Sequence, residues 1–328
     1  MSRSSALPVV APAGVSARRR SQGSLQVGRE VGVLRGLLWA SPWLVGFIAF
    51  MAVPVGMSLY YSFTDYNLVQ RPVFIGLENY ERMVTDGLFW KAVGNTVLYA
   101  AMSIPLCTVA ALVIASLLNK PIMGVSIYRA AVFLPTLVPA VASAMVWLWL
   151  YNGDLGLINR ILRPMLEPLG VTPPNWIGLR GSGDKFWAMP ALVFMSVWSV
   201  GQSVVIYLAA MRDVPAALYE AAALDGMGPV AQFRHVTLPA ISPVILFSVI
   251  TSIINSSQIF GAPYIMTQGG PDRATYVYSM YLYDAAFVYD ALGMGYASAM
   301  AWVQLVVIVL LTVLTLVMSR SLVYYRAA

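Results

Sequence analysis

The chain has 328 residues, of which 59% are hydrophobic and only 10% are charged. Soluble proteins are typically about half apolar and about a quarter charged, so this composition excludes a soluble globular protein and predicts a membrane protein. The formal net charge of +6 is not concentrated in a basic patch interleaved with aromatic residues, so the sequence offers no sign of nucleic-acid binding.

Stretches without a charged residue divide the chain, and each is longer than the roughly 20 residues that cross a bilayer as a helix. They are residues 36–64, 92–119, 130–153, 186–211, 235–271 and 291–319. Their length excludes a β-barrel, whose strands are short and alternate in polarity. The sequence therefore predicts an all-α, polytopic membrane protein with six transmembrane helices.

The predicted organisation begins with a basic tail. Residues 1–30 are rich in Ser, Arg, Gly, Ala and Pro, which predicts a disordered cytoplasmic segment. The first apolar stretch is too long for a signal-peptide core, so we expect an uncleaved span within a single transmembrane domain, residues 31–326. The predicted spans are residues 36–62, 92–118, 130–151, 187–210, 239–263 and 292–318.

The orientation follows from the distribution of basic residues. With the N-terminus inside, twelve of the twenty Lys and Arg residues fall in cytoplasmic segments. Because cytoplasmic loops carry an excess of Lys and Arg, we expect both termini to be cytoplasmic, together with the polar segment 212–238.

The segment 212–238 has the pattern of two short helices between two spans. Asp213 and Pro215 are expected as the N-cap and first residue of the first short helix. Gly226 is expected to close that helix in a left-handed conformation, and Pro229 to begin the next. The apolar side of the first helix and its charged Glu220 suit a helix that docks in a groove of another protein.

The residues Glu220-Ala221-Ala222, then Gly226, then Val236-Thr237-Leu238-Pro239 resemble the EAA motif of binding-protein-dependent ABC importers. The resemblance implies that segment 212–238 is the coupling loop that docks on a separate ATPase subunit. Carried over in register, the coupling residues are Glu220, Ala221, Ala222, Asp225, Gly226, Leu238 and Pro239. The alternative is a loop that only joins two spans.

Three further segments are similar to sugar-importer permeases of the maltose/glycerol-3-phosphate class, within which the chain resembles the first of two permeases. They are residues 74–80, 128–135 and 267–272. The resemblance implies a type I ABC importer transmembrane fold with a permease core over residues 91–320. It also implies a bacterial or archaeal cell (inner) membrane, a heterodimer with a second permease, two ATPase subunits, an extracytoplasmic solute-binding protein and a sugar substrate.

No catalytic site is expected in the chain. There is no phosphate-binding Gly-x-x-x-x-Gly-Lys-Ser/Thr loop, so no cofactor is expected here, and ATP and Mg would bind the partner ATPase. Cys107 and His235 are the sole cysteine and histidine and predict no metal site. An ion-coupled secondary carrier, an ion channel and a non-transporting structural subunit remain alternatives, although the apolar stretches contain no ionisable relay.

The solute path is sought among polar residues inside the apolar stretches, because a sugar needs hydrogen-bonding partners there. The candidates are Thr136, Ser199, Gln202, Ser203, Asn255, Ser257 and Gln258. Asn255 and Gln258 share a helix face, which we expect Ser203 and Thr136 to oppose. Packing between helices is the alternative role for each. The tyrosines at 276–289 are expected to form an interfacial belt.

Overall fold

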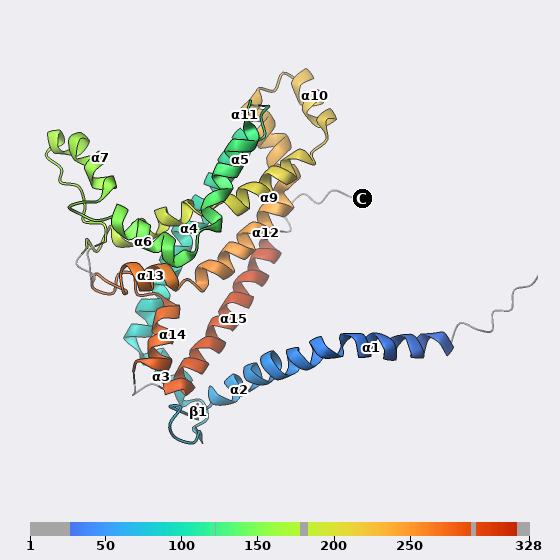
Figure 1. The fold of residues 1–328 in the computed structure, drawn as a ribbon, viewed down its shortest axis with the longest axis vertical. Helices are drawn as coiled ribbons and strands as arrows, with labels where there is room; N and C mark the ends of the chain where they lie inside the picture. Colours follow the sequence, from blue (N-terminus) through green and yellow to red (C-terminus); the bar gives the residue numbers. More distant parts are fainter. Residues whose placement is uncertain (1–26, 122, 178–182, 290–292, 320–328) are drawn as a thin grey trace, which may run out of the picture. The chain divides into compact units, whose positions relative to one another are not determined.

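The computed structural model describes residues 27–121, 123–177, 183–289 and 293–319. It divides into two compact units, residues 1–57 and residues 58–328. Figure 1 shows the helices as ribbons coloured along the chain, from blue at the N-terminus to red at the C-terminus. The predicted tail lies mostly outside the described residues, although its last positions, from Val27, are helical.

The first unit is a long apolar helix. It consists of α1 (Val27–Phe47), the π-helical turn η1 (Ile48–Ala52) and the start of α2 (Val53–Tyr61). None of its described side chains from residue 35 onward is buried, and Trp39 and Phe50 are 88% and 86% exposed. An apolar helix with exposed sides suits a hydrocarbon environment.

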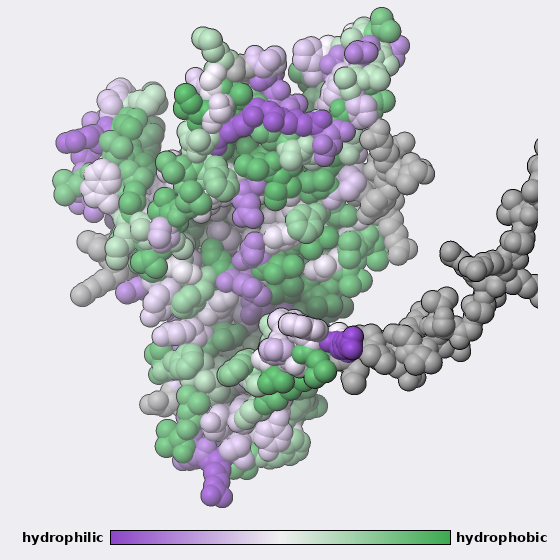
Figure 2. Space-filling model, turned by 45° about the vertical axis from the view of Figure 1, so that its right-hand side comes forward, coloured by the Kyte–Doolittle hydropathy of each residue, from purple (hydrophilic) through white to green (hydrophobic). Residues whose placement is uncertain are grey.

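The second unit is built on three long helices. They are α4 (Gly87–Leu118), α12 (Leu238–Ser257) and α15 (Gly293–Ser319). Asp86 caps α4 by accepting a hydrogen bond from the Leu88 amide at 2.8 Å. Figure 2 shows hydrophobic residues over most of the central part of one face, with hydrophilic residues gathered at its upper and lower ends.

Two of the predicted spans are bent helix pairs. The first consists of α5 (Val125–Phe133), η2 (Leu134–Leu137) and α6 (Ala140–Leu150), with a bend of 99°, and Pro135 and Pro139 lie at the break. The second pairs α8 (Ala188–Val197) with α9 (Gly201–Arg212) at 45°. The described residues therefore contain four helices long and apolar enough to cross a membrane, or up to six spans if each bent pair is one span.

The fifth predicted span also differs from the expectation. A helical stretch runs continuously from α11 (Pro229–Gln232) through the π-helical turn η5 (Phe233–Thr237) into α12, so the start of this span lies inside the predicted coupling loop. At its other end, α12 stops at Ser257, and α13 (Gly261–Met266) follows after a break. The polar residues 255–258 thus lie at a break inside the candidate span Pro229–Met266.

Short elements join the spans. They are β1 (Thr64–Asp65) paired antiparallel with β2 (Val73–Phe74), α3 (Glu78–Thr85), α7 (Leu157–Leu166), η3 (Glu167–Leu169), α10 (Ala216–Leu224) and α14 (Tyr278–Phe287). The β1–β2 hairpin and α3 pack on α15, and α14 packs between α4 and α15.

The second unit has separate clusters of buried side chains. One surrounds Tyr278, Tyr281 and Tyr296, a second surrounds Trp147 and Leu192, and a third surrounds Val204 and Tyr207. Small residues such as Ala111 and Ala115 in α4 are fully buried, which lets α9 approach α4 closely. The helices α8, α9, α12 and α14 therefore pack along α4, whereas α15 packs on α12 and α14, and α13 packs on α6.

Candidate functional sites: an exposed short helix and a polar chamber

The short helix α10 begins later than the sequence predicts. Asp213 adopts φ −79° and ψ −7°, and its amide donates to Ala209, so it is the last residue of α9's final turn and not the N-cap of α10. Pro215 is the N-cap of α10, with φ −59° and ψ 134°, and it is not the first helical residue. Asp213 is thus the C-cap of α9, and α10 begins at Ala216.

The end of α10 agrees with the sequence prediction. Gly226 has φ +78°, a left-handed conformation. The Met227 amide donates to the Ala222 carbonyl at 2.9 Å, and the Gly226 amide donates to the Ala223 carbonyl at 3.0 Å. These two bonds define a Schellman cap, which satisfies carbonyls that the helix leaves free. After it, Pro229 is the first residue of α11.

One side of α10 is held and the other is exposed. Ala222 is 5% exposed, and the Tyr219 hydroxyl is 2.9 Å from the Thr237 hydroxyl on η5. Opposite them, Leu224 is 90% exposed and Glu220 is exposed, with no ion pair to any described residue. Ala221 and Asp225 are also exposed. An apolar and acidic surface of this kind suits a protein partner.

The remaining residues of the motif lie where α12 begins. Leu238 is half-buried at the junction of η5 and α12, and Pro239 follows it directly. Because the helix is continuous here, Pro239 removes one backbone hydrogen bond next to the π-helical turn. Pro239 also lines a cavity of about 490 Å³ together with Leu218, Asp213 and His235. The structure therefore brings both ends of the predicted motif to the same part of the molecule.

A small polar chamber lies between α4, the α8–α9 pair and α12. Its volume is about 270 Å³. Its lining residues are Tyr99, Ser103, Ile104, Cys107, Ser196, Ser199, Val200, Ser203, Ser252, Asn255, Ser256 and Ile259. We refer to this set as the polar chamber.

Some polar side chains of the chamber are paired within the protein. The Ser103 and Ser256 hydroxyls are 3.5 Å apart, and the Cys107 sulfur is 3.3 Å from the Ser196 hydroxyl. Ser196 also donates to the Val193 carbonyl at 2.5 Å. These contacts join α4 to α8 and α12.

Other side chains of the chamber have no hydrogen bond to the described part of the chain. They are Ser199, Ser203, Ser252 and Asn255. In contrast, Ser116, Thr251 and Thr315 donate to carbonyls of their own helices, as hydroxyls in apolar helices commonly do. The free hydroxyls and amide can donate to and accept from a polar solute.

The structure gathers only part of the predicted solute set. Ser199, Ser203 and Asn255 line the chamber together. Gln202 and Gln258 are exposed and do not line it. Thr136 donates to the Phe133 carbonyl at 2.6 Å, and its methyl group lies against Gly201, so it does not oppose Asn255.

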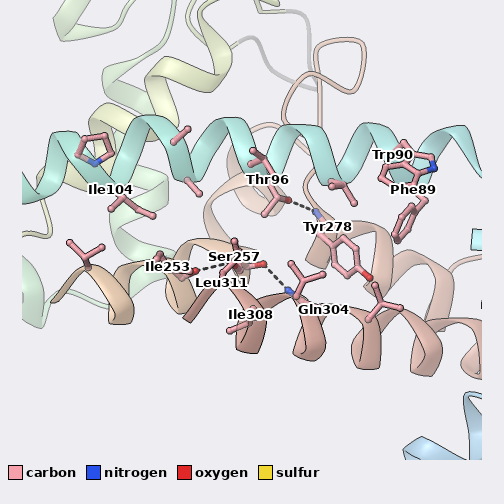
Figure 3. A pocket seen from close by; sticks show the side chains of 18 residues that line it. Phe89, Trp90, Thr96, Ile104, Ile253, Ser257, Tyr278, Gln304, Ile308 and Leu311 are labelled. Atoms are coloured by element: carbon pink, nitrogen blue, oxygen red, sulfur yellow. Dashed lines mark hydrogen bonds between the residues drawn. The ribbon is translucent and has the colours of Figure 1, made fainter. Parts of the chain in front are cut away.

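Ser257 belongs to a different cavity. It lines an apolar cavity of about 550 Å³ between α4, α12 and α15. Figure 3 shows its hydroxyl bonded to the Ile253 carbonyl and its own carbonyl accepting from Gln304, at 2.7 Å each. Because both groups are satisfied within the protein, the position of Ser257 is explained by packing.

Hydrogen bonds to the Asp86 carboxylate hold the N-terminal end of α4. The Asp86 carboxylate, which caps α4, also accepts hydrogen bonds from Tyr281 and from Tyr296, the latter at 3.0 Å. Partial burial raises the pKa of Asp86, but the bonds from Tyr281, the Leu88 amide and Tyr296 outweigh this and hold the pKa below its ordinary value.

The neighbouring tyrosines differ from the expected interfacial belt. Tyr276, Tyr278 and Tyr281 are buried, and the Tyr278 hydroxyl donates to the Met300 carbonyl at 2.7 Å. Tyr283 is half-buried and Tyr289 is 36% exposed. The turn before them is tied to α4, since the Asn95 amide donates to the Arg273 and Tyr276 carbonyls at 2.8 and 2.9 Å. Most of these tyrosines form the core beneath an ordered loop.

The structure combines helices long and apolar enough to cross a membrane with an exposed short helix, α10, and an open, hydroxyl-lined chamber beside α4 and α12. The sequence matches the family described as the binding-protein-dependent transport system inner membrane component over residues 87–325. The chain therefore belongs to this family of membrane permeases. The family contains non-catalytic transport subunits, which confirms the prediction that the chain is not an enzyme.

Several named relatives are similar over most of their length. The probable ABC transporter permease protein YesP of Bacillus subtilis is 36% identical over 78% of this chain and 81% of its own. The trehalose/maltose transport system permease protein MalF of Thermococcus litoralis is 34% identical over 73% and 79%. The lactose transport system permease protein LacF of Rhizobium radiobacter is 32% identical over 77% and 84%.

Solved structures support the fold. A bacterial ABC transporter involved in import of the acidic polysaccharide alginate matches with a TM-score of 0.72 and 21% identity, over 90% of this chain and 99% of that one. The alginate transporter in complex with an alginate pentasaccharide-bound periplasmic protein matches with a TM-score of 0.74 and 20% identity, over 92% and 98%. The predicted ABC importer permease fold is therefore confirmed.

Proposed function

We propose that the chain is a membrane-spanning subunit of an ATP-driven sugar importer. The relatives named as permeases for trehalose, maltose and lactose support sugar as the solute class. In this proposal the chain pairs with a second permease, two ATPase subunits and an extracytoplasmic solute-binding protein. It lies in a bacterial or archaeal cell membrane with both termini in the cytoplasm.

The observation that carries the proposal is the exposed, Schellman-capped helix α10. It is fixed to η5 through Tyr219 and Thr237, so a push on α10 is passed directly to α12. Its free surface presents Leu224 and an unpaired Glu220, which suit a groove and a basic residue on an ATPase. ATP and Mg then bind the ATPase partner, and this chain transmits the resulting motion.

The polar chamber is the candidate solute path in this chain. It lies against α12, the helix that follows the coupling segment, so movement of α10 reaches the chamber through a single continuous helix. A sugar crossing an apolar bundle requires replacement of its hydration, and the free hydroxyls and amide of the chamber supply it.

The experiment that tests the proposal is uptake by the reconstituted transporter. We expect no ATP hydrolysis by the purified chain alone. With its partners in proteoliposomes, uptake of the sugar carried by the solute-binding protein should require ATP and should persist when a protonophore collapses the proton gradient. Uptake that the protonophore abolishes at constant ATP would identify an ion-coupled secondary carrier and contradict the proposal.

A further inference from the structure

The helix α7 lies directly beyond α6. Figure 1 shows α7 at the end of α6 that is farther from α5. In the turn that joins the two helices, the Asn152 side chain accepts hydrogen bonds from the amides of Asp154 and Leu155, at 3.0 and 2.9 Å. Because α6 is the second half of a candidate span and the turn is short, α7 begins close to where that span ends.

One buried side chain sets the rotation of α7 about its own axis. Asn159 is 2% exposed, and its amide donates to the Gly153 and Pro174 carbonyls at 3.0 Å each. The same side chain accepts a hydrogen bond from the Trp176 indole at 2.7 Å. These bonds hold one side of α7 against the protein, so the opposite side is presented outward.

The outward side of α7 is apolar. Leu157, Ile161 and Met165 are spaced four residues apart, which places them on one side of the helix. Their side chains are 43%, 58% and 66% exposed. We refer to these three residues as the apolar stripe. Large apolar side chains aligned in this way require an apolar phase to cover them.

Basic residues border the apolar stripe. Arg160 and Arg163 are exposed, and α7 contains no acidic residue. Successive residues of a helix differ by about 100° in direction, so Arg160 points sideways from the stripe and Arg163 points away from it. The Arg160 guanidinium makes no hydrogen bond or ion pair to the described residues. An apolar side with a basic edge is typical of a helix that lies in the interface plane of a bilayer.

Exposed aromatic residues lie near α7. Trp149, close to the end of α6, is 57% exposed, and Phe186 is 72% exposed. The Trp187 ring packs against Phe186, and its centroid is 5.1 Å from that of Trp176, the residue bonded to Asn159. Because Trp is enriched where a membrane meets water, these residues indicate a membrane boundary at the level of α7.

We propose that α7 is an interfacial helix, which lies in the plane of the bilayer surface beyond the end of α6 and anchors that end there. The apolar stripe then enters the boundary between headgroups and acyl chains, about 5–10 Å deep, and the Arg160 guanidinium meets lipid phosphates. Lipid is the occupant because it is the apolar phase that exposed side chains of α6, such as Met145 and Trp149, already require. The proposal rests on the membrane placement of the α5–α6 pair and needs neither the solute nor the ATPase.

A fluorescence measurement of depth tests the proposal. The transporter is assembled in nanodiscs of phosphatidylcholine and phosphatidylglycerol, with Cys107→Ser in this chain and partner subunits without cysteine. One NBD fluorophore is attached at Ile161→Cys, or at Arg163→Cys as the matched control on the opposite side of α7. A nitroxide on the upper part of the lipid acyl chain quenches the fluorophore. Without the solute-binding protein, we expect quenching at position 161 to be at least twofold stronger than at position 163.

Met165→Cys provides a second position in the apolar stripe and should be quenched like Ile161→Cys. Equal quenching at positions 161 and 163 would contradict the orientation of α7. Absence of quenching at both positions of the stripe would overturn the proposal. In that case, a change in NBD emission on adding the solute-binding protein would show that the stripe docks on that protein instead. The measurement uses neither ATP nor solute, so it does not depend on the importer assignment.

A charge reversal tests the contact with phosphates. Arg160→Glu places a carboxylate beside the anionic headgroups, so quenching of the label at Ile161→Cys should fall at least twofold in bilayers that contain phosphatidylglycerol. The fall should be smaller in phosphatidylcholine alone. The matched control is Arg71→Glu, because Arg71 is exposed, lies between β1 and β2, and has no bonded partner among the described residues. Equal effects of the two variants, or no effect of Arg160→Glu, would contradict the contact.

Discussion

At the scale of single residues, Gly226 is the position whose conformation most directly determines the exposed surface of α10. Its φ of +78° lies in the left-handed region, and a Cβ added there would meet no atom within 4 Å. Any effect of a substitution therefore comes from backbone strain and not from a clash.

We predict that Gly226→Val weakens ATPase binding and transport. A β-branched residue in this conformation costs about 1–3 kcal/mol, and relief of that strain would unwind the Schellman cap and redirect α11. The matched control is Gly228→Val, because Gly228 has φ −73° and equally open surroundings. Co-purification of the ATPase measures the effect. Similar loss in both variants, or normal recruitment by Gly226→Val, would contradict the coupling role.

Sequence reasoning at this scale succeeded where a residue's backbone preference decides the structure. Gly226 and Pro229 are such residues: Gly226 has the predicted left-handed conformation, and Pro229 is the first residue of α11, as predicted. Asp213 was misplaced because a short polar residue before a proline also fits the last turn of a preceding helix. Ser103, Ser196, Ser252 and Ser256 line the chamber but are not in the predicted solute set, since a serine carries no signal of which side of its helix faces the chamber.

At the scale of elements, the start of α9 packs very closely on α5 and η2. A Cβ on Gly201 would lie 2.4 Å from the Val132 carbonyl oxygen and 2.9 Å from the Thr136 methyl carbon. Gly201 begins α9, whose neighbouring residues Ser199 and Ser203 line the chamber. The packing of α9 on α5 and η2 therefore depends on the missing side chain.

We predict opposite effects for two helical glycines. Gly201→Ala should destabilise the protein by about 1–3 kcal/mol through overpacking and should reduce transport. Gly94→Ala on α4 meets no atom within 4 Å and should be neutral or stabilising, by up to about 1 kcal/mol, because alanine favours helix. Thermal unfolding in detergent measures both. A Gly201→Ala protein as stable as Gly94→Ala would show that α9 does not require this contact.

The sequence does not predict the bends within the third and fourth spans. Apolar composition over residues 130–151 and 187–210 identifies membrane-compatible segments, but it does not report a break within them. Pro135 and Pro139 explain one break after the fact, since a proline both removes an amide donor and restricts the residue before it. The end of α12 at Ser257 has no comparable proline in the sequence.

At the scale of the whole molecule, the sequence identified the class of protein because composition and length are properties of the entire chain. The charge-free stretches and the register of the motif in residues 220–239 required no tertiary information. The set of residues facing the chamber required it, because Ser257 and Asn255 are two positions apart and line different cavities. The two side chains point in different directions around α12. Which direction faces which cavity is set by helices that are distant in sequence and pack on α12.

Orientation in the membrane is also a property of the whole chain, and the basic-residue distribution predicts it. Single cysteines in a Cys107→Ser background test it at exposed positions. Val69 is 90%, Met123 97%, Leu169 75% and Leu224 90% exposed. With a membrane-impermeant maleimide on intact cells, we expect labelling at Val69→Cys and Leu169→Cys, and labelling at Met123→Cys and Leu224→Cys only after permeabilisation.

The labelling pattern shows separately whether the bent helix pairs cross the membrane and on which side of the membrane α10 lies. Met123 and Leu169 lie on either side of the α5–α6 pair, so labelling of both from the same side would mean that the bent pair does not cross the membrane. Leu224 lies on α10, so its labelling in intact cells would place the exposed helix outside, where no cytoplasmic ATPase reaches it. Labelling of Leu169→Cys from outside, with Leu224→Cys protected, requires the second bent pair, α8–α9, to cross as well, because that pair is the connection between the two positions.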